Sequence, residues 1–308
     1  MMTKVFIDGS AGTTGLRIRE RLASRKDLVL LELPDMLRKD PEARKDALNS
    51  ADVAFLCLPD DAARESASLV SSGSTVLIDT STAHRTDSAW TYGFPELHGQ
   101  REKLRESRRI ANPGCHASGF ISLIAPLIAE KALSPDVLLS CTSLTGYSGG
   151  GRKMIAEYEG ADRNPLLEAP RLYSLSQVHK HLPEMVVCCG LSQAPVFCPV
   201  VAPYYAGMEV IVPLHASQLN VEGSLLPDIY ADYYRDEQLI RVVPSGGEAG
   251  FLSASALAGR DILQISVEGG ERITLIARFD NLGKGASGAA IQNMNLALGV
   301  PEDTGLVI

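Results

Sequence analysis

The stretch VFIDGSAGTTG, residues 5–15, decides the fold of the first part of this 308-residue chain. Val5–Ile7 predicts a strand, and apolar residues at helical spacing after Gly15 predict a helix. The turn between them has glycines at GxxGxxG spacing, so its backbone can approach a pyrophosphate while the helix N-terminus supplies N–H donors. Glycine turns also occur without a ligand, so the prediction depends on the pattern of the neighbouring strands and helices. We expect a dinucleotide to bind along Gly9, Ser10, Ala11, Gly12, Thr13, Thr14 and Gly15.

The pattern after this turn supports a dinucleotide-binding domain. Apolar runs alternate with helix-like segments, which is typical of βαβ units in a parallel sheet. The runs lie at residues 28–33, 53–58 and 75–79, the helical segments at 41–49 and 60–70, and a short strand is expected at Ile110-Ala111. The sequence therefore predicts a Rossmann-type doubly wound parallel sheet.

The choice between NAD and NADP is left open by the residues after the second strand. Glu32 suits a ribose hydroxyl, whereas Arg38 and Lys39 could hold a 2′-phosphate. Both signals lie within a few residues of each other, so neither dinucleotide is favoured by the sequence pattern alone.

A second informative stretch is Asn112-Pro113-Gly114-Cys115-His116, which precedes an amphipathic helical segment. Cys115 is expected to open that helix, where unpaired N–H groups and the helix dipole favour the thiolate. The tight turn before it exposes the thiol, and Asn112 offers an amide donor for an oxyanion hole. The alternative is a structural cysteine that is merely buried.

The pattern changes after this helix. Pro126 is expected to bend or split it. Strand-like runs come next without βαβ alternation, which predicts an α+β region with a largely antiparallel or mixed sheet; they lie at residues 137–145, 196–201, 208–214, 239–243, 262–267 and 272–279. The glycine cluster at residues 146–151 ends in Arg152 and Lys153, so it could bind an anionic substrate group or be a flexible surface loop.

The segment His179-Lys180-His181-Leu182-Pro183-Glu184 suggests general acid–base chemistry. A histidine near neutral pKa can take the thiol proton and later return one to a developing alkoxide. No further His or Cys is placed nearby to complete a zinc site, so we expect no metal. Histidines facing solvent on a turn are the alternative, and the sequence does not say which imidazole would serve.

Composition bounds the class of protein. A net charge of −8 without a basic block argues against nucleic acid and against a polybasic membrane contact, which favours a small-molecule ligand. No apolar run approaches the length of a membrane span and no leader pattern is seen, so we expect a cytoplasmic protein. Six cysteines without CxxC spacing predict neither disulfides nor a zinc site.

Taken together, these motifs resemble the N-acetyl-γ-glutamyl-phosphate reductase family of arginine biosynthesis, in its shorter form. The resemblance rests on residues 9–15, 112–115, 179–184 and the Lys284-Gly285-Ala286 segment near the end, and it spans nearly the whole chain. It implies an NADP-binding Rossmann domain at 1–114 and 284–308, and a catalytic and subunit-contact domain at 115–283 in a homodimer or homotetramer. Thr13-Thr14 stands where many relatives carry an aromatic residue, which affects only local packing.

The resemblance also implies a reaction. Cys115 would attack the acyl phosphate, release phosphate and form a thioester, which NADPH then reduces to the semialdehyde. His181, or His179 in its place, would be the acid–base, and Asn112 would steady the oxyanion. The remaining roles implied are cofactor binding by Arg38, Lys284 and Gly285, and substrate binding by Arg152, Lys153 and Glu184.

Three other functions remain open from the sequence. The first is a reductase of aspartyl phosphate of the aspartate-semialdehyde dehydrogenase type, which shares the mechanism. The second is a dinucleotide-binding sensor without activity, and the third is a cysteine hydrolase, which would need no dinucleotide.

Overall fold

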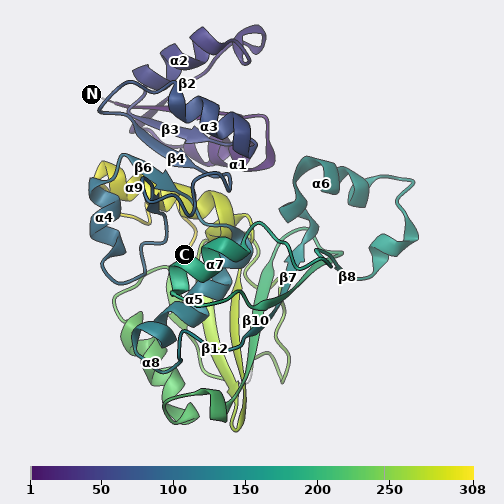
Figure 1. Cartoon of the computed structure of the whole chain (residues 1–308). Coiled ribbons are helices and arrows are strands. Elements are labelled where there is room, and N and C mark those ends of the chain that lie inside the picture. Colours follow the sequence, from purple (N-terminus) through teal and green to yellow (C-terminus); the bar gives the residue numbers. More distant parts are fainter. Residues whose placement is uncertain (1, 246) are drawn as a thin grey trace. The chain divides into compact units, whose positions relative to one another are not determined.

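The computed structural model describes residues 2–245 and 247–308 and divides the chain into two compact units (Figure 1). Unit 1 consists of the chain up to Pro113 together with Ala286–Leu306, and unit 2 of Gly114–Gly285 with Val307–Ile308. The predicted boundaries, after residue 114 and before residue 284, differ from these by one and two residues, and Val307–Ile308, expected in the first domain, belong to unit 2. The chain therefore passes from one unit to the other three times.

Unit 1 is built on a six-stranded parallel sheet with the order β2-β1-β3-β4-β6-β5. Its strands are β1 (Thr3–Asp8), β2 (Leu28–Leu31), β3 (Val53–Leu56), β4 (Val76–Asp79), β5 (Thr91–Tyr92) and β6 (Arg109–Ala111). Every residue of β3 and β4 is buried, as expected for central strands that are covered on both faces. The predicted doubly wound sheet is confirmed.

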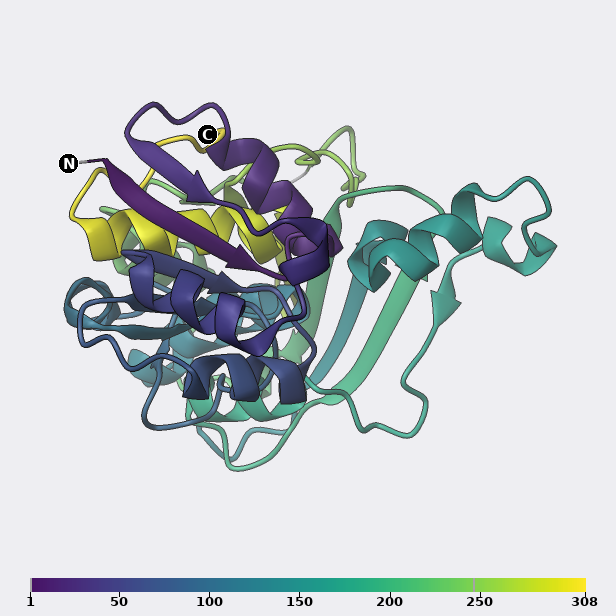
Figure 2. The same cartoon turned by 90° about the horizontal axis from the view of Figure 1, so that it is seen from above.

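Helices of unit 1 cover both faces of this sheet. They are α1 (Thr13–Leu22), α2 (Pro41–Ser50), α3 (Asp60–Ser68), α4 (Gln100–Glu106) and α9 (Gly288–Leu298), with a 3-10 turn, η1, at Asp35–Leu37. Helices α1 and α9 lie beside β1 (Figure 2). One core cluster joins these three elements, with Ile18, Ile291 and Met294 packed with Val5. A second cluster joins α2 and α3 to the sheet. Residues from both ends of the chain thus share one core.

Unit 2 is built on a seven-stranded mixed sheet with the order β11-β12-β13-β10-β7-β9-β8. Its strands are β7 (Ser140–Gly146), β8 (Arg171–Leu172), β9 (Val196–Ala202), β10 (Met208–His215), β11 (Ile240–Val242), β12 (Leu263–Gly269) and β13 (Arg272–Phe279). The β7–β9 and β11–β12 pairs are parallel and the others antiparallel. The predicted α+β half is confirmed.

The principal helix of unit 2 is α5 (Cys115–Ala129), which packs on β10 and β13 and beside α7 (Leu182–Cys189) and α8 (Leu226–Tyr233). Gly119 allows the close approach of α5 to the sheet, because a Cβ there would lie 2.4 Å from Cγ2 of Val210. Shorter elements complete the unit: α6 (Gly151–Glu159), the 3-10 turns η2 (Tyr147–Gly150), η3 (Pro165–Glu168), η4 (Ala216–Gln218) and η5 (Gly223–Leu225), and a π-helical turn, η6 (Gly283–Ser287), that contains the boundary with unit 1.

Pro126 does not split α5, which was one of the two outcomes expected from the sequence. A proline removes the N–H that would bond the carbonyl four residues earlier, here that of Ser122. The Tyr234 hydroxyl donates to this carbonyl at 2.9 Å, and the Tyr230 hydroxyl donates to the Leu123 carbonyl at 2.5 Å. Because α8 and the residue after it supply these donors, the helix continues through the proline to Ala129.

Among the described residues, no helix is both long enough and apolar enough to cross a membrane.

Candidate active site

The three glycines of the first turn occupy their positions for different structural reasons. Gly9 has φ +87°, and a Cβ there would lie 2.3 Å from the Cys57 carbonyl oxygen; a Cβ at Gly15 would lie 2.5 Å from the Gly9 oxygen. Both positions therefore need glycine for the packing of the chain itself. At Gly12, which caps α1, the nearest described atom to an added Cβ is 3.5 Å away, an ordinary contact. The free space before Gly12 fits a ligand that approaches the helix N-terminus.

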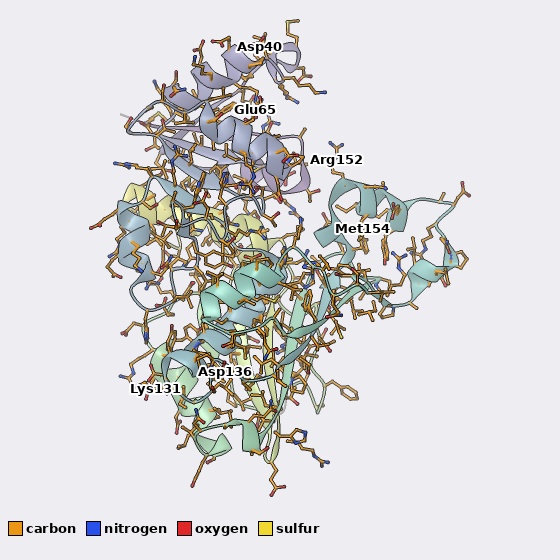
Figure 3. The ribbon with its side chains drawn as sticks, viewed as in Figure 1. Asp40, Glu65, Lys131, Asp136, Arg152 and Met154 are labelled. Atoms are coloured by element: carbon orange, nitrogen blue, oxygen red, sulfur yellow. The ribbon has the colours of Figure 1, made fainter. Side chains whose placement is uncertain are left out.

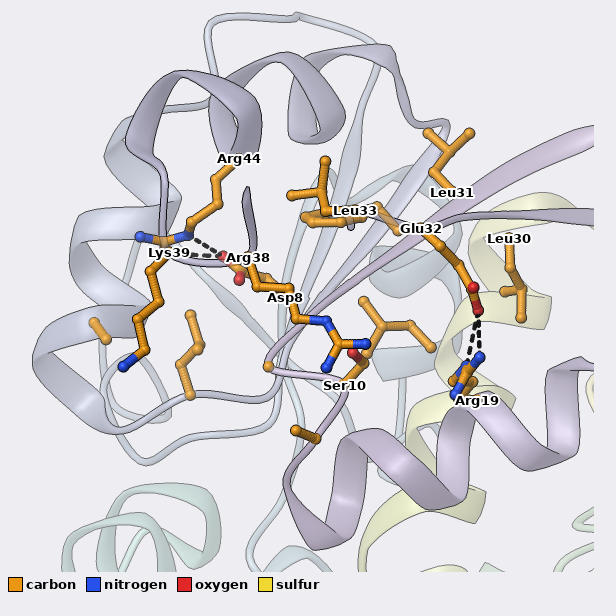
Figure 4. Close-up of a pocket in the computed structure, with 16 residues that line it drawn as sticks. Asp8, Ser10, Arg19, Leu30, Leu31, Glu32, Leu33, Arg38, Lys39 and Arg44 are labelled. Atoms are coloured by element: carbon orange, nitrogen blue, oxygen red, sulfur yellow. Dashed lines mark hydrogen bonds and ion pairs between the residues drawn. The ribbon is translucent and has the colours of Figure 1, made fainter. Parts of the chain in front are cut away.

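A cavity of about 380 Å³ in unit 1 lies beside this turn (Figure 4). Its volume falls in the range of small-molecule and cofactor sites. The apolar part of its wall includes Leu30, Leu31, Leu33 and Leu58, and the polar part Asp8, Ser10, Arg19, Glu32, Arg38, Lys39 and Arg44. Because four of these side chains are cationic and two anionic, the cavity suits a ligand with negative charge.

Several ion pairs hold the charges around this cavity, and one of them joins Arg38 to Asp35 at 2.8 Å. Glu32 is paired with Arg19 at 2.7 Å, so its carboxylate already has a cation. Deeper, Asp8 at the end of β1 is buried and accepts from Arg44 at 2.9 Å and from the Ser66 hydroxyl at 2.6 Å. The sequence analysis identified Arg38 but missed Arg19 and Arg44; Arg44 could have been suspected because it falls on the buried face of an amphipathic helix.

In unit 2, Cys115 is the first residue of α5, as predicted, and it is half-buried. The preceding N–H, that of Gly114, donates to Oε2 of Glu184 at 3.1 Å, and this carboxylate lies buried in the first turn of α7. Behind the thiol, a Cβ at Gly285 would lie 3.0 Å from Cβ of Cys115. Glu184 and Gly285 therefore shape the surroundings of the cysteine, while their ligand-binding roles stay predictions.

The two predicted histidines lie together at the start of α7. His181 is buried, and its backbone N–H donates to Nδ1 of His179 at 3.1 Å. The two rings are perpendicular with centroids 4.7 Å apart. Burial of His181 excludes the alternative in which that ring faces solvent.

A third histidine, His116, completes this group, and the sequence analysis did not single it out. Its ring centroid is 5.5 Å from those of both His179 and His181. Its Nδ1 lies 2.7 Å from the Ser143 hydroxyl, and its Nε2 lies 2.7 Å from the Tyr173 hydroxyl. Burial, and then the charge of His179, lowers the pKa of His116 to about 3, so this ring is neutral near pH 7.

Asn112 belongs to unit 1, where its side chain is buried and engaged. Its Nδ2 donates to the Ala286 carbonyl at 3.1 Å, and its Oδ1 accepts from Nδ2 of Asn293 at 3.1 Å. Its own carbonyl accepts from Nε of Arg85 at 2.9 Å. The amide thus ties the end of β6 to the residues around the start of α9, and its role as an oxyanion donor stays a prediction.

Other predicted site residues occupy different settings. Arg152 and Lys153 are exposed in the first turn of the helix α6 (Figure 3), so the alternative of a flexible surface loop is wrong for these two residues, and their binding of an anionic group stays a prediction. Lys284 is buried in η6 of unit 2. All six cysteines are free thiols, and the described part of the chain holds no group of three or more His, Cys, Asp or Glu side chains placed to bind a metal ion.

Comparison with known proteins agrees with this arrangement. The family model described as "semialdehyde dehydrogenase, NAD binding domain" matches residues 30–107, and the one described as "semialdehyde dehydrogenase, dimerisation domain" matches residues 115–281. Among solved structures, aspartate semialdehyde dehydrogenase II of Vibrio cholerae superposes with a TM-score of 0.73 at 17% identity, covering 97% of this chain and 99% of that one. At that identity the likeness concerns the fold.

Sequence relatives are much closer. The N-acetyl-gamma-glutamyl-phosphate reductase of Rhizobium etli (strain CIAT 652) is 45% identical over 97% of this chain and 99% of its own length. The N-acetyl-gamma-glutamyl-phosphate reductase 2 of Nostoc sp. is 43% identical over 98% of this chain and 99% of its own. The resemblance inferred from the motifs is confirmed: the chain belongs to the N-acetyl-γ-glutamyl-phosphate reductase family of semialdehyde dehydrogenases.

Proposed function

We propose that this protein reduces N-acetyl-γ-glutamyl phosphate to N-acetylglutamate semialdehyde with NADPH and releases phosphate, as a step of arginine biosynthesis. The observation that carries the proposal is Cys115 at the first position of α5, backed by Gly285 and beside the buried start of α7. A thiol at a helix N-terminus is stabilised as thiolate and is the nucleophile that forms acyl-enzymes.

The chain's own groups account for each step of this reaction. The Cys115 sulfur attacks the acyl carbon, and the electrons of the C–O bond leave with phosphate, which gives a thioester. NADPH, when bound, supplies the hydride that reduces the thioester carbonyl. The resulting oxyanion is steadied by the Cys115 N–H, and one good donor contributes about 3 kcal/mol. His181, with His179 as the alternative, takes and returns the protons, and the thiolate departs as the aldehyde forms.

We further propose NADP over NAD, with Arg38 and Lys39 holding the 2′-phosphate. In an NAD site Glu32 would accept a ribose hydroxyl; here its carboxylate is paired with Arg19 at 2.7 Å, as Arg38 is with Asp35 at 2.8 Å, and Lys39 adds a further cation to the cavity wall. Changing Lys39 to Ala is expected to lower kcat/KM for NADPH at least tenfold while changing that for NADH less than twofold. Equal losses with both cofactors would contradict this assignment.

Subunit contact is proposed for unit 2, because the dimerisation-domain model matches residues 115–281. A homodimer or homotetramer is expected, and light scattering coupled to size exclusion measures its mass. A monomer at micromolar concentration would contradict the proposal.

The function itself is best tested in reverse, where the aldehydes can be handled. Purified protein is mixed with NADP and phosphate, and formation of NADPH is followed with N-acetylglutamate semialdehyde and, separately, aspartate semialdehyde. Rapid phosphate-dependent reduction with the first aldehyde alone is expected. Preference for the second would make the protein an aspartyl phosphate reductase.

The matched control is Cys115→Ser, which replaces the sulfur with oxygen at nearly constant size. It should abolish turnover while NADPH binding, followed by fluorescence of the nicotinamide, is unchanged. Full activity in this variant would refute the thioester route.

A further inference from the structure

The carboxylate of Glu184 joins the starts of two helices in unit 2. Glu184 is the third residue of α7 and is 1% exposed, and its Oε2 accepts from the Gly114 N–H at 3.1 Å. Gly114 is the N-cap residue of α5 and directly precedes Cys115. A buried carboxylate of one helix therefore caps the helix that begins with the proposed nucleophile.

This contact differs from the usual arrangement at a helix start. A glutamate at the third position of a helix normally accepts from the backbone N–H of its own N-cap residue, which forms a capping box. In α7 the N-cap residue is His181, and its N–H donates to Nδ1 of His179 at 3.1 Å instead. Because the imidazole of His179 accepts from this N–H, the carboxylate of Glu184 is available to the Gly114 N–H.

The backbone of Gly114 is held on both sides. Gly114 has no side chain to pack, so contacts of its backbone groups hold its orientation. Its carbonyl accepts from the Ser118 N–H at 2.8 Å and from the Ser118 hydroxyl at 3.1 Å, while its N–H donates to Glu184. These contacts keep Gly114 at φ −80° and ψ 144°.

The orientation of Gly114 decides where the next N–H points. In a trans peptide the C=O group and the following N–H point in opposite directions. The Gly114 carbonyl points into α5, toward Ser118, so the Cys115 N–H points out of the helix start. In the reaction proposed above, this N–H is the donor to the oxyanion.

We propose that Glu184 is a positioning residue: by holding the Gly114 N–H, its carboxylate fixes the peptide that carries the Cys115 N–H. His179 contributes to the same arrangement, because its Nδ1 takes the N–H that Glu184 would otherwise bond. This inference rests on the proposed function, since the oxyanion is that of its reaction. It replaces substrate binding as the role of Glu184.

Two reagents that modify Cys115 measure the effect without substrate or cofactor. Attack of the sulfur on p-nitrophenyl acetate passes through an oxyanion, forms an acetyl thioester and expels nitrophenolate. Alkylation by iodoacetamide displaces iodide from a saturated carbon and forms no oxyanion. Both reactions need the thiolate, so the ratio of their rates at one pH reports the oxyanion donor. Peptide mapping and the Cys115→Ser protein identify the reaction of Cys115 among the thiols.

Two changes of Glu184 separate its position from its charge. Glu184→Asp keeps the charge but is one methylene too short to reach the Gly114 N–H, so the ratio of ester to alkylation rate should fall at least about thirtyfold. Glu184→Gln keeps an acceptor oxygen in reach without the charge and should hold the ratio within about threefold of wild type. The matched control is Glu209→Gln, which changes another buried glutamate of unit 2, on β10, and should leave the ratio unchanged.

The Gly114 N–H is also observed directly, because Pro113-Gly114 is the single Pro-Gly pair of the sequence. Protein labelled with ¹³C-carbonyl proline and ¹⁵N-glycine gives one amide signal for this pair, whose hydrogen exchange is measured. In His179→Leu this exchange should be at least about tenfold faster than in wild type, since Glu184 turns to the released His181 N–H. In His179→Asn it should stay within about threefold, because an asparagine side chain also accepts from the N–H two residues on.

An unchanged ratio in Glu184→Asp, or equal losses of both rates, would overturn the proposal, because Glu184 would then only stabilise the fold. A ratio that falls as far in Glu184→Gln would assign the effect to charge and overturn it too. If Glu184→Asp does not fold, His179→Leu decides: its ratio should fall together with the protection of Gly114, and an unchanged ratio would overturn the proposal.

The reverse assay is independent of these measurements. Failure of that assay with the expected changes in ratio would refute the proposed substrate and leave the role of Glu184 standing. Normal turnover with an unchanged ratio in Glu184→Asp would refute this inference alone.

Discussion

Acid should destabilise unit 2 through His116, and the size of the effect is set by its burial. The pKa of this histidine is lowered from 6.5 to about 3 because the ring is buried. Between these two pH values the ring is protonated in the unfolded chain but neutral in the folded protein, so the free energy of unfolding rises with pH across this window. The contribution is fully present above pH 6.5 and is lost as the pH falls toward 3. From pH 7.5 to pH 5 the loss is about 2 kcal/mol, and the slope approaches about 1.4 kcal/mol per pH unit.

The reference protein for this measurement is His116→Gln, which cannot titrate. The free energy of unfolding in urea is measured for wild type and variant at pH 7.5 and at pH 5. The difference between the two proteins is then compared at the two pH values, because the contributions of the other titrating groups cancel in that difference. Unfolding of unit 2 is followed by pulse labelling of Cys141 and Cys189, both buried thiols of that unit, with a disulfide reagent that reacts in mild acid. A difference that stays constant between the two pH values would refute the reasoning, because His116 would then titrate as it does in the unfolded chain.

Two further predictions concern unit 1, whose unfolding is reported by the fluorescence of Trp90, the single tryptophan of the chain. Gly12→Ala should leave the free energy of unfolding of unit 1 unchanged within about 0.5 kcal/mol and weaken NADPH binding at least tenfold. Gly15→Ala should lower that free energy by more than ~2 kcal/mol. Similar stabilities for the two variants would contradict the distinction between these glycines. Arg44→Met should lower the stability by about 3–5 kcal/mol at pH 7, because it leaves the Asp8 carboxylate buried without its cation, and a loss below ~1 kcal/mol would show that water reaches this group.

Local signals made much of the fold predictable. The βαβ alternation of the first half and the strand runs of the second half predicted most of the strands, because hydrophobic periodicity reports burial directly, but they missed the short strands β5 and β8 and the helices α4, α6 and α8. The place of Cys115 at the start of a helix was also predictable from sequence, since Asn112-Pro113-Gly114 cannot continue a helix and the residues after it can.

The failures come from contacts between residues far apart in the chain. Pro126 was expected to bend or split its helix, and only the fold shows that Tyr230 and Tyr234 supply donors around it. His116 attracted no notice because its partners, Ser143 and Tyr173, are distant in sequence. A side chain's role in a hydrogen-bond chain depends on which groups the tertiary structure places beside it. The hydrophobic periodicity of the sequence does not contain this information.

The passage of the chain into unit 1 for a second time has a consequence for biosynthesis. Helix α9 contributes Ile291 and Met294 to the core formed by Val5, Ile7 and Ile18. These residues leave the ribosome well before α9, so the core that they build lacks this helix until α9 has been made as well. Domains usually fold in the order of their synthesis. Here the early strands cannot complete their core until α9 has been made, so they expose apolar sheet surface during that interval of synthesis.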